Sequence, residues 1–511
     1  MSDESQDEVF RFLADPATHD GAAVKRVDTH AAAVFLAGAA AYKVKRAVKF
    51  PFLDFSTRAK RKAALEAEIV ANRPFAPDLY CEIIPITRRN AALALGGSGE
   101  ALEWALKMHR FDEEATLDRL AERGRIDATL IEALARAVAA AHARSPVVDA
   151  SPWIAALGDY IEQNDSALRE RVDLFDPGAV AALTAKSRAA LARVRPLLLA
   201  RGTDGLVRRG HGDLHLGNIA LIDDRPVPFD ALEFDPVVAS GDVLYDLGFL
   251  LMDLVERKLP GAANLVLNVY LAATRRPTDL DALAALPLFM SLRAAIRAKV
   301  TAARLTNTAS DQRQTITMQA KAYFALACDL IAPLPPRLVA IGGLSGTGKS
   351  VLARALAPDL APAPGAVLLR SDVERKAMFG VAENDKLPPE AYTLDIGQRV
   401  YAALADQARR VLTAGHSAIV DAVFARDDER MAIADAARKH KVAFKGLFLT
   451  ADLATRIARV GNRVHDASDA DAEVARAQEN YTHGAIDWAE IDASGTPDET
   501  LKRTKAALDT R

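Results

Sequence analysis

Short hydrophobic runs and longer amphipathic stretches follow one another along this chain and predict its first two structural regions. Over the first 110 residues, apolar runs bounded by turn residues predict strands at 29–38, 40–48, 82–87 and 102–111. A charged stretch at 57–73 carries apolar residues on one stripe, which predicts a helix. From residue 127 to about 330 an Ala- and Leu-rich helical pattern dominates, broken by a strand-and-loop cluster at 206–235. The chain therefore begins sheet-rich and continues helical.

A proline-rich segment separates these regions from a third one. Pro333, Pro335 and Pro336 break any helix and are typical of a linker. Beyond them, helical stretches alternate with apolar runs at 338–341, 366–369, 417–423 and 444–449. This alternation is typical of a parallel, doubly wound sheet, so residues 334–511 are predicted to form an α/β domain.

Composition narrows the classes of protein that remain. The 511 residues are 50% hydrophobic and 26% charged, with a formal net charge of −3. These proportions exclude a mainly disordered chain, a collagen-like repeat and a polybasic nucleic-acid coat. Cys81 and Cys328 are too few for a disulfide framework and fit a reducing compartment. Because the apolar runs are too short to cross a bilayer and the N-terminal segment is acidic, we expect a cytoplasmic protein that uses no membrane.

The strongest local motif is G-L-S-G-T-G-K-S, which directly follows the apolar run at 338–341. It fits G-x-x-x-x-G-K-[ST], in which backbone amides and a helix N-terminus cradle phosphates. The lysine places a charge on the β- and γ-phosphates, and the last hydroxyl ligates Mg²⁺. We therefore predict that ATP and Mg²⁺ bind at the loop residues Gly343, Ser345, Gly346, Thr347, Gly348, Lys349 and Ser350.

An Asp-x-x-Arg pair after the next apolar run fits a small kinase better than a mechanical ATPase. Asp372 follows the run at 366–369 closely, and Arg375 lies three residues further on. A carboxylate at the carboxyl end of a strand faces the ligand crevice of such a sheet, where it can accept a hydroxyl proton. The alternative role for Asp372 is a helix N-cap.

Two later features complete the predicted nucleotide site. Asp421 ends the sequence S-A-I-V-D at 417–421, in the place of a second-strand acid that binds Mg²⁺ through water. Arg456, Arg459 and Arg463 lie on one basic helical stretch. That stretch forms either a lid over the phosphates or a solvated face.

On these motifs, residues 337–511 resemble the P-loop kinase group that includes gluconate kinase, polynucleotide kinase and zeta-toxin-like enzymes. In the polynucleotide kinase branch an Asp-x-x-Arg pair activates the acceptor hydroxyl and grips the substrate. The resemblance implies a catalytic role for Asp372 and a substrate-binding role for Arg375. It identifies the group of kinases and leaves the acceptor open.

A second motif, H-G-D-L-H-L-G-N, occupies residues 211–218, and Asp230 follows twelve residues later. The spacing D-x-x-x-x-N matches a kinase catalytic loop, in which Asp213 accepts the hydroxyl proton and Asn218 binds Mg²⁺. Asp230 stands at the end of a short predicted strand and is suited to bind the same metal. The sequence thus predicts a second site of phosphoryl transfer.

This second motif differs from that of the protein kinases. Gly212 replaces the arginine of H-R-D, and no D-F-G or A-P-E motif is present. The pattern instead resembles aminoglycoside phosphotransferases and choline- and homoserine-kinase-like enzymes. The resemblance implies an α+β, protein-kinase-like domain over residues 1–333, with an N-lobe at about 1–110 and a C-lobe at about 111–333. An α/β P-loop NTPase domain with a parallel sheet then follows at 334–511.

A fold of this kind needs an ATP-binding lysine and a helix glutamate that holds it. Lys43 and Lys45 lie two apart on one predicted strand, and the sequence leaves the choice between them open. We expect Glu66 to be the partner, because the apolar residues three and four positions later are predicted to face the core. Glu68 is the alternative.

The order of the two domains resembles a bacterial family of bifunctional aminoglycoside phosphotransferase/ATP-binding proteins. This implies that each half transfers the γ-phosphoryl group of Mg·ATP to a hydroxyl of a small polyhydroxylated substrate. One alternative is a single kinase regulated by a P-loop half that binds or hydrolyses ATP. Another is a polynucleotide-kinase-like activity in the C-terminal half.

The predicted partners are small molecules. Residues 43–62 hold eight basic residues against one acid, Asp54, which leaves a nucleic-acid patch open. We prefer a solvated face plus one ATP lysine, because the chain as a whole is slightly acidic. No protein partner is inferred.

Overall fold

The computed structural model describes residues 4–50, 53–89, 92–233, 235–307, 310–461, 467–481 and 486–509. The chain packs into two compact units. The first consists of Met1–Asp159 and Leu198–Leu250, and the second of Tyr160–Leu197 and Leu251–Arg511. The predicted division at residue 333 falls where α11 (Ser310–Ile331) passes into β13 (Arg337–Gly343). The compact units divide elsewhere, within the helical region.

An antiparallel sheet of six strands opens the first unit, in the order β1-β2-β3-β8-β6-β7. Its strands are β1 (Val24–Asp28), β2 (Ala32–Ala37), β3 (Ala40–Lys45), β6 (Tyr80–Arg89), β7 (Ala92–Leu95) and β8 (Glu100–His109). A short hairpin follows β3, formed by β4 (Lys49–Phe50) and β5 (Leu53–Asp54). Gly38 makes the tight turn between β2 and β3 with a φ of 56°. The predicted strands at 82–87 and 102–111 are confirmed by β6 and β8.

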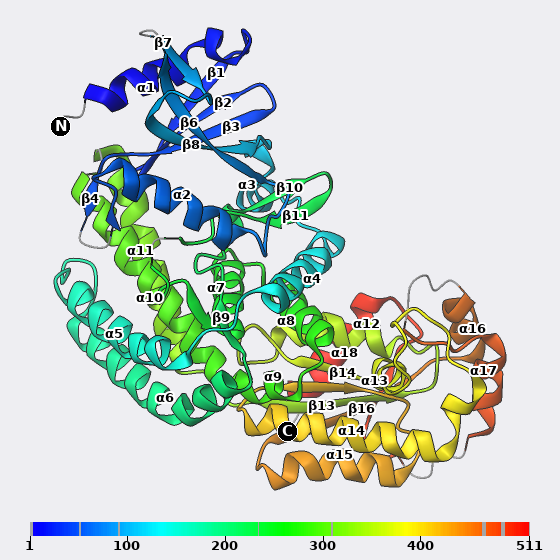
Figure 1. Ribbon diagram of the computed structural model, residues 1–511. Coiled ribbons are helices and arrows are strands. Elements are labelled where there is room, and N and C mark those ends of the chain that lie inside the picture. Colours follow the sequence, from blue (N-terminus) through cyan, green and yellow to red (C-terminus); the bar gives the residue numbers. More distant parts are fainter. Residues whose placement is uncertain are drawn as a thin grey trace. The chain divides into compact units, whose positions relative to one another are not determined.

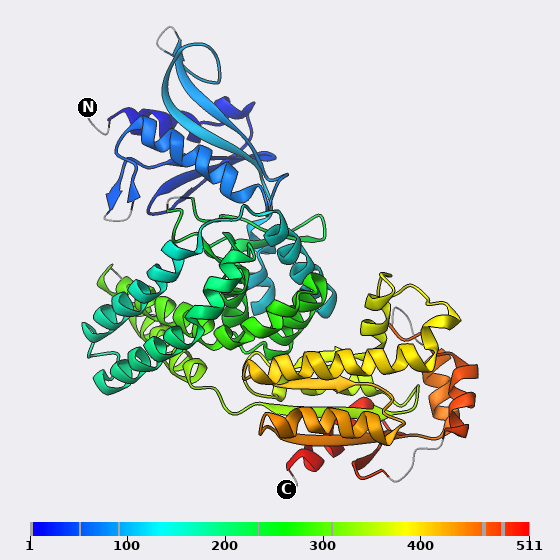
Figure 2. The same ribbon diagram turned by 60° about the horizontal axis from the view of Figure 1, so that its bottom comes forward.

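Two helices cover opposite faces of this sheet, as Figures 1 and 2 show. α1 (Glu4–Ala14) packs on the face that includes Val44 and Ala105, and α2 (Arg58–Asn72) packs on the face that includes Leu106. Successive side chains of a strand point to opposite faces. Lys43 and Lys45, the neighbours of Val44, therefore project toward α2.

The rest of the first unit carries the second motif. Its helices are α3 (Leu117–Glu122), α4 (Ala128–Arg144), the first half of α5 (Ala150–Arg169) and most of α7 (Val243–Glu256). Short strands occupy the predicted strand-and-loop cluster: β9 (Val207–Arg209), β10 (Ile219–Ile222), β11 (Arg225–Pro228) and β12 (Ser240–Asp242). The hairpin of β10 and β11 separates Asn218 from Asp230.

The second unit begins with helices. They are α6 (Pro177–Thr203), α8 (Pro260–Thr274), α9 (Pro277–Asp281), α10 (Leu286–Arg304) and α11. α10 and α11 pack along each other, and Ser291 Oγ donates to Ala327 O at 2.8 Å between them. Among the described residues, no helix combines the length and the apolar character needed to cross a membrane.

A parallel sheet of five strands forms the rest of the second unit, in the order β14-β15-β13-β16-β17. Besides β13, its strands are β14 (Val367–Arg370), β15 (Ala418–Asp421), β16 (Ala443–Thr450) and β17 (Ala489–Asp492). Figures 1 and 2 show α12 (Lys349–Leu356) and α18 (Pro497–Asp509) over one face, with α14 (Leu394–Thr413) and α15 (Asp427–Lys439) over the other. The predicted parallel sheet is confirmed. β17 was not predicted, because it has only four residues and two of them are acidic.

Buried His416 makes the stability of this sheet depend on pH. Its Nε2 donates to Gly365 O at 2.8 Å, and burial lowers the pKa of the imidazole from 6.5 to about 4. Between these two values the unfolded chain binds a proton that the folded chain does not, so stability falls as the pH drops from 6.5 toward 4. The full effect is about 3 kcal/mol.

We expect His416→Gln to remove most of this acid-side loss of stability. The free energy of unfolding would be measured by urea denaturation at pH 7 and pH 4.5, with the fluorescence of Trp488 as the signal and the other two tryptophans replaced by Phe. His440→Gln, at a partly exposed position, is the control. An equal pH dependence in wild type and His416→Gln would contradict this assignment.

Candidate active sites

The predicted phosphate loop connects β13 to α12 and has the backbone that a phosphate cradle requires. Gly343, Gly346 and Gly348 all have positive φ, and a Cβ at Gly346 would stand 2.5 Å from Arg456 O. Only glycine fits such a position without displacing backbone. Lys349 begins α12, and its Nζ donates to Leu344 O at 3.1 Å within the loop. The loop is therefore preformed, with its lysine held over it.

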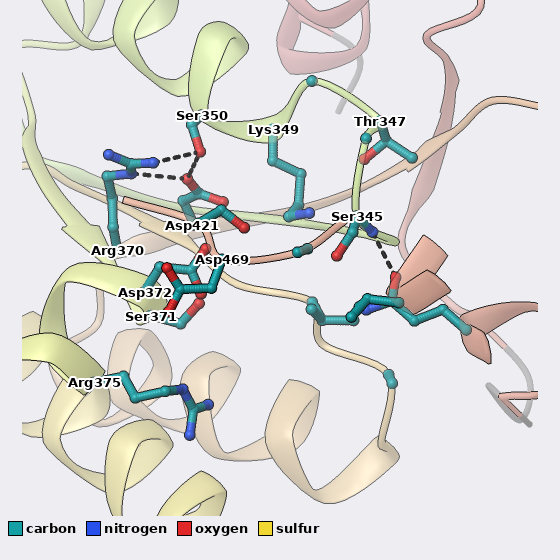
Figure 3. A pocket seen from close by; sticks show the side chains of 18 of the residues that line it. Ser345, Thr347, Lys349, Ser350, Arg370, Ser371, Asp372, Arg375, Asp421 and Asp469 are labelled. Carbon is teal, nitrogen blue, oxygen red and sulfur yellow. Dashed lines mark hydrogen bonds and ion pairs between the residues drawn. The ribbon is translucent and has the colours of Figure 1, made fainter. Parts of the chain in front are cut away.

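Two oxygen ligands suited to Mg²⁺ meet beside the loop (Figure 3). Ser350 Oγ donates to Asp421 Oδ2 at 2.5 Å, and Asp421 is the last residue of β15. A hydroxyl and a carboxylate are hard oxygen donors of the kind that Mg²⁺ prefers. The guanidinium of Arg370 lies against both, 3.0 Å from Ser350 Oγ and 3.4 Å from Asp421 Oδ2. The residues predicted to hold the metal are thus brought together.

Asp372 lies in the same cavity, on the first turn of α13 (Ser371–Met378). Burial raises the pKa of its carboxyl, and the negative charge of Asp421 raises it further. A raised pKa makes a carboxylate a better proton acceptor near neutral pH. The N-cap of α13 is Arg370, so the alternative role of Asp372 as the helix cap is wrong.

Arg375 lines the cavity one helical turn beyond Asp372. Its Nη1 donates to Ala391 O at 2.7 Å, and its guanidinium lies over the ring of Tyr392, 5.1 Å from the centroid. Its Nε is buried and has no hydrogen-bond partner in the structure. The cavity, of about 1290 Å³, is also lined by Lys349 and Ser350, so Arg375 and the end of the phosphate loop border one space.

The three arginines of the basic stretch have different surroundings. Arg456, on α16 (Leu453–Gly461), is buried, and its Nε donates to Ser345 O at 2.9 Å, so it supports the phosphate loop from behind. Arg459 lines the cavity and donates to Ala493 O at 2.8 Å. Arg463 lies outside the described residues. A solvated face is therefore the wrong description of Arg456.

Several residues of this site were not predicted. Gln478 Oε1 accepts a hydrogen bond from Ser345 N at 2.7 Å. Ser468 hydrogen-bonds to Asp372. Asp469 accepts from Tyr392 Oη at 2.7 Å. They come from the segment that follows α16, more than 90 residues beyond Asp372 or the loop, and no local pattern marks them.

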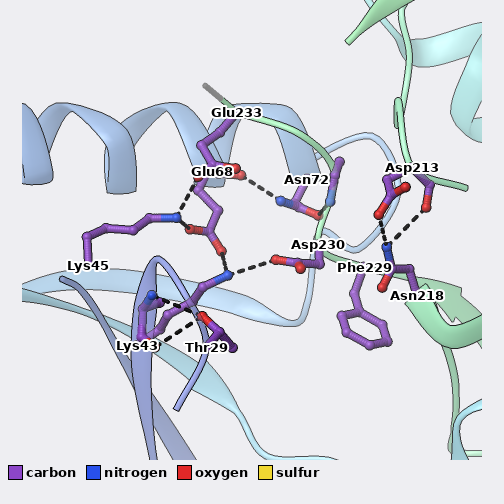
Figure 4. Close-up of polar contacts among 12 residues, drawn as sticks. Thr29, Lys43, Lys45, Glu68, Asn72, Asp213, Asn218, Phe229, Asp230 and Glu233 are labelled. Carbon is purple, nitrogen blue, oxygen red and sulfur yellow. Dashed lines mark hydrogen bonds and ion pairs between the residues drawn. The ribbon is translucent and has the colours of Figure 1, made fainter. Parts of the chain in front are cut away.

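In the loop at residues 211–218, Asp213 and Asn218 lie in direct contact (Figure 4). Asn218 Nδ2 donates to Asp213 Oδ2 at 2.9 Å and to Asp213 O at 3.0 Å. Its amide oxygen is the atom left to ligate a metal. Asp246, buried on α7, accepts from His211 N at 2.8 Å and from Gly212 N at 2.9 Å. The buried carboxylate of Asp246 thus holds the backbone at the start of the loop in place.

Histidines hold this loop in two ways. His211 Nε2 donates to Phe229 O at 2.8 Å, and burial lowers the pKa of its ring, so it orients the loop as a neutral side chain. Gly217 N donates to His215 Nδ1 at 3.1 Å, which leaves the proton on Nε2, 3.4 Å from Asp213 Oδ2. Both contacts restrain the orientation of the loop and of the Asp213 carboxylate.

Lys43 stands at the centre of the charged contacts (Figure 4). Its Nζ lies 2.7 Å from Glu68 Oε1 and 2.7 Å from Asp230 Oδ1. Burial alone lowers the pKa of Lys43, but the two carboxylates outweigh it and raise the pKa well above its usual value. The charge of Lys43 in turn lowers the pKa of Asp230. Lys45 lies deeper, 2.7 Å from Glu68 Oε2 and 2.6 Å from Glu233 Oε1.

The prediction that Glu66 holds the lysine is wrong, and Glu68 takes that place. The inward stripe of α2 includes Leu65 and Glu68, which are three residues apart. Glu66 is one residue beyond Leu65 and therefore turns away, to a side chain 55% exposed that pairs with Lys62. Val70, predicted to face the core, is 63% exposed. The buried face of α2 therefore differs from the predicted face.

Two family models match separate parts of this chain. The model of the phosphotransferase enzyme family matches residues 89–286, and the model of an AAA domain matches residues 338–483. The second match includes the residues of the P-loop site, and the first includes Asp213, Asn218 and Asp230 but begins after Lys43 and Glu68. The protein is an ATP-dependent kinase. This kinase joins a protein-kinase-like phosphotransferase fold to a P-loop domain.

Relatives and solved structures resemble the kinase over long stretches. It is 28% identical over 460 residues to uncharacterised proteins of Mycobacterium tuberculosis and Mycobacterium bovis, covering 88% of each chain. A choline/ethanolamine kinase family protein from Mesorhizobium loti covers 64% of this chain and 99% of its own, with 15% identity and a TM-score of 0.36. A gluconokinase from Sinorhizobium meliloti covers 34% of this chain and 91% of its own, with 18% identity and a TM-score of 0.26.

The two glutamates of α2 offer a matched test of the lysine site. We expect Glu68→Gln to destabilise the first unit by about 3 kcal/mol, because it leaves two buried ammonium groups without their shared carboxylate. Glu66→Gln, two positions away and exposed, is expected to change the free energy of unfolding by less than about 0.5 kcal/mol. Urea unfolding followed by Trp104 fluorescence would measure both. Equal effects of the two variants would contradict the assignment of Glu68.

Proposed function

We propose that the kinase has two separate sites, and that each transfers the γ-phosphoryl group of Mg·ATP to a hydroxyl of a small polyhydroxylated molecule. One observation carries the proposal. Each site unites a cation for phosphate, two oxygen ligands for a metal and a carboxylate placed to accept a proton. A domain that only sensed ATP would not need the last of these groups.

In the first site Lys43 binds the phosphates, held by Glu68. Lys43 is preferred to Lys45 because its Nζ also contacts Asp230, the proposed metal ligand, whereas Lys45 is buried against Glu68 and Glu233. Asn218 and Asp230 would hold Mg²⁺, which neutralises charge on the phosphates when bound. Asp213 orients the acceptor hydroxyl and takes its proton. Catalysis then rests on positioning and electrostatics.

In the second site the loop amides and Lys349 hold the phosphates, while Ser350 and Asp421 would hold Mg²⁺. Asp372 accepts the proton of the acceptor hydroxyl, and the raised pKa of its carboxyl suits that role. Arg375 grips the acceptor, since its buried Nε has no hydrogen-bond partner and its guanidinium borders the cavity. These contacts support phosphoryl transfer over a regulatory ATPase in this half.

The acids of the helical region argue against a polycationic antibiotic as the acceptor. Three of them are paired with arginines: Glu162 with Arg188, Asp165 with Arg169, and Asp253 with Arg257. These ion pairs reduce the negative charge that the three acids could offer to a polycation. A neutral or anionic polyol fits better, and a nucleic acid is not the preferred partner.

Two substitutions separate the two proposed activities. Asp213→Asn removes the proton acceptor of the first site, and Lys349→Ala removes the phosphate-binding lysine of the second. We expect each to lower its own acceptor-stimulated ADP release by about 100-fold or more and to leave the other activity within twofold. A metabolite-pool screen with labelled ATP on the full chain would identify the two activities. If Lys349→Ala changes only the regulation of a single activity, the two-site proposal fails.

Arg375 provides a test of acceptor binding. We expect Arg375→Ala to raise the KM for the acceptor of the second site about tenfold, since a charged hydrogen bond of about 1.5 kcal/mol is lost. The affinity for ATP, measured with a fluorescent analogue, should not change. Arg438→Ala, at a side chain 77% exposed on α15, serves as the control. A loss of ATP affinity with an unchanged acceptor KM would contradict this role.

A further inference from the structure

β14 is an edge strand of the parallel sheet, and only one of its sides pairs with another strand. β15 is its neighbour on that side, where Val367 N donates to Ser417 O at 2.9 Å. Backbone groups on the other side of an edge strand need partners from elsewhere or from water. Here they face α8, which lies beside β14 in Figure 1.

Two asparagines of α8 bind this free side. Asn268 Oδ1 accepts from Leu368 N at 2.7 Å, and Asn268 Nδ2 donates to Ala366 O at 3.1 Å. Asn264 Nδ2 donates to the same carbonyl at 3.0 Å. A side-chain amide that both accepts and donates reproduces the pair of groups that a neighbouring strand would present. The asparagines therefore substitute for a sixth strand.

This contact is tightly built. Asn264 is 3% exposed and lies one helical turn from Asn268, whose Nδ2 also donates to Asn264 O at 3.0 Å. Gly365 precedes the strand with a φ of 115°, and a Cβ there would stand 2.7 Å from Asn264 Nδ2. His416 donates to the carbonyl of Gly365 from the other direction. The start of β14 is thus fixed from both sides.

A second contact joins the helices that precede β13 to the domain that contains β14. Arg410 of α14 lies 2.8 Å from Asp281, at the end of α9. Both side chains are more than 30% exposed, so the energy of this ion pair is small. Neither of its side chains makes a hydrogen bond or an ion pair with β14, which makes it a suitable internal control for the asparagine contacts.

The strand held by α8 leads directly into the P-loop site. Arg370 is the last residue of β14, two positions beyond Leu368, and Asp372 follows on α13. Arg370 contacts Ser350 and Asp421, and Asp372 is the proposed proton acceptor. A shift of about 1 Å in reacting groups can cost about 100-fold in rate. The pairing of β14 on both sides therefore bears on catalysis.

We propose that Asn264 and Asn268 are positioning residues for the P-loop kinase site. They act through β14, whose carboxyl end places Arg370 and Asp372 against Ser350 and Asp421. α8 belongs to the stretch that matches the phosphotransferase enzyme family, at 89–286. A helix within the phosphotransferase match thus supplies hydrogen bonds to the edge of the sheet that carries the P-loop site. The inference rests on the proposed function of the P-loop site.

The test compares Asn264→Ala, Asn268→Ala and Asn268→Asp with Arg410→Ala, all in the full chain. Asn268→Asp keeps the acceptor for Leu368 N and loses the donor to Ala366 O. ATP consumption is measured in the presence of a metabolite pool, which supplies the acceptor. The turnover of the P-loop site is the part of this consumption that Lys349→Ala abolishes. It is expressed per site that binds a fluorescent ATP analogue, so that misfolded protein is not counted. Hydrogen exchange would report on peptides that include Leu368, with β13 as the internal reference.

We expect the two alanine variants to lose about tenfold in turnover per site, with the KM for ATP within twofold of wild type, because the loop and α12 are not touched. Exchange at Leu368 should become faster in both, and exchange in β13 should not. Asn268→Asp should protect Leu368 more than Asn268→Ala does. Arg410→Ala should match wild type in every measurement.

The possible failures are distinguishable. If wild type shows no turnover that depends on Lys349, the proposed function of the P-loop site fails, and the exchange data alone decide whether α8 holds β14. If that turnover is present and the asparagine variants keep it within twofold, the positioning role is overturned. Unchanged exchange at Leu368 in Asn268→Ala would overturn the strand contact itself.

Discussion

Parallel pairing of β13, β14 and β15 is the constraint on which the P-loop site depends. The register sets Asp421 opposite Ile341 on one side and opposite Arg370 on the other. Because parallel strands end at the same edge of a sheet, the loop after β13 meets the acid of β15 and the start of α13 there. A slip of one residue would move each group by about 3.3 Å and turn its side chain to the other face.

In the first unit the equivalent constraint is the burial of Glu68 between two lysines. A carboxylate with no exposure is stable only when it is paired, and Lys43 and Lys45 each contact one of its oxygens. The same pairing fixes the side chain of Lys43 beside Asp230. The charge of Lys43, which stabilises the buried acid, is also the charge that we propose binds phosphate.

The two sites therefore bring similar groups together by different means. One arranges a lysine on an antiparallel sheet against a catalytic loop, and the other arranges a lysine on a glycine-rich loop at the edge of a parallel sheet. Both set a carboxylate near two oxygen ligands. The second unit also shows that the domains are not independent modules, since α8 supplies hydrogen bonds that the edge of the P-loop sheet lacks.

Local pattern was sufficient for most elements and for the residues within each motif. The loop at Gly343–Ser350 and the spacing from Asp213 to Asn218 are short-range features, because the chemistry needs those residues within one turn or one loop. The predicted helix at 57–73 also ends within one residue of α2. The choice between Glu66 and Glu68 failed, however, because these residues are two positions apart and therefore about 200° apart around the helix.

What the sequence by itself determined was the presence of a phosphate-loop motif and a kinase catalytic-loop motif, and the order of the two folds. The tertiary structure alone decided which lysine meets Asp230, which glutamate is buried, and that Gln478 and Asp469 reach the P-loop site. It also decided that α8 closes the edge of β14. The physical reason is distance along the chain: these contacts join residues about 25 to 190 positions apart, and no local pattern encodes a partner that only packing brings near.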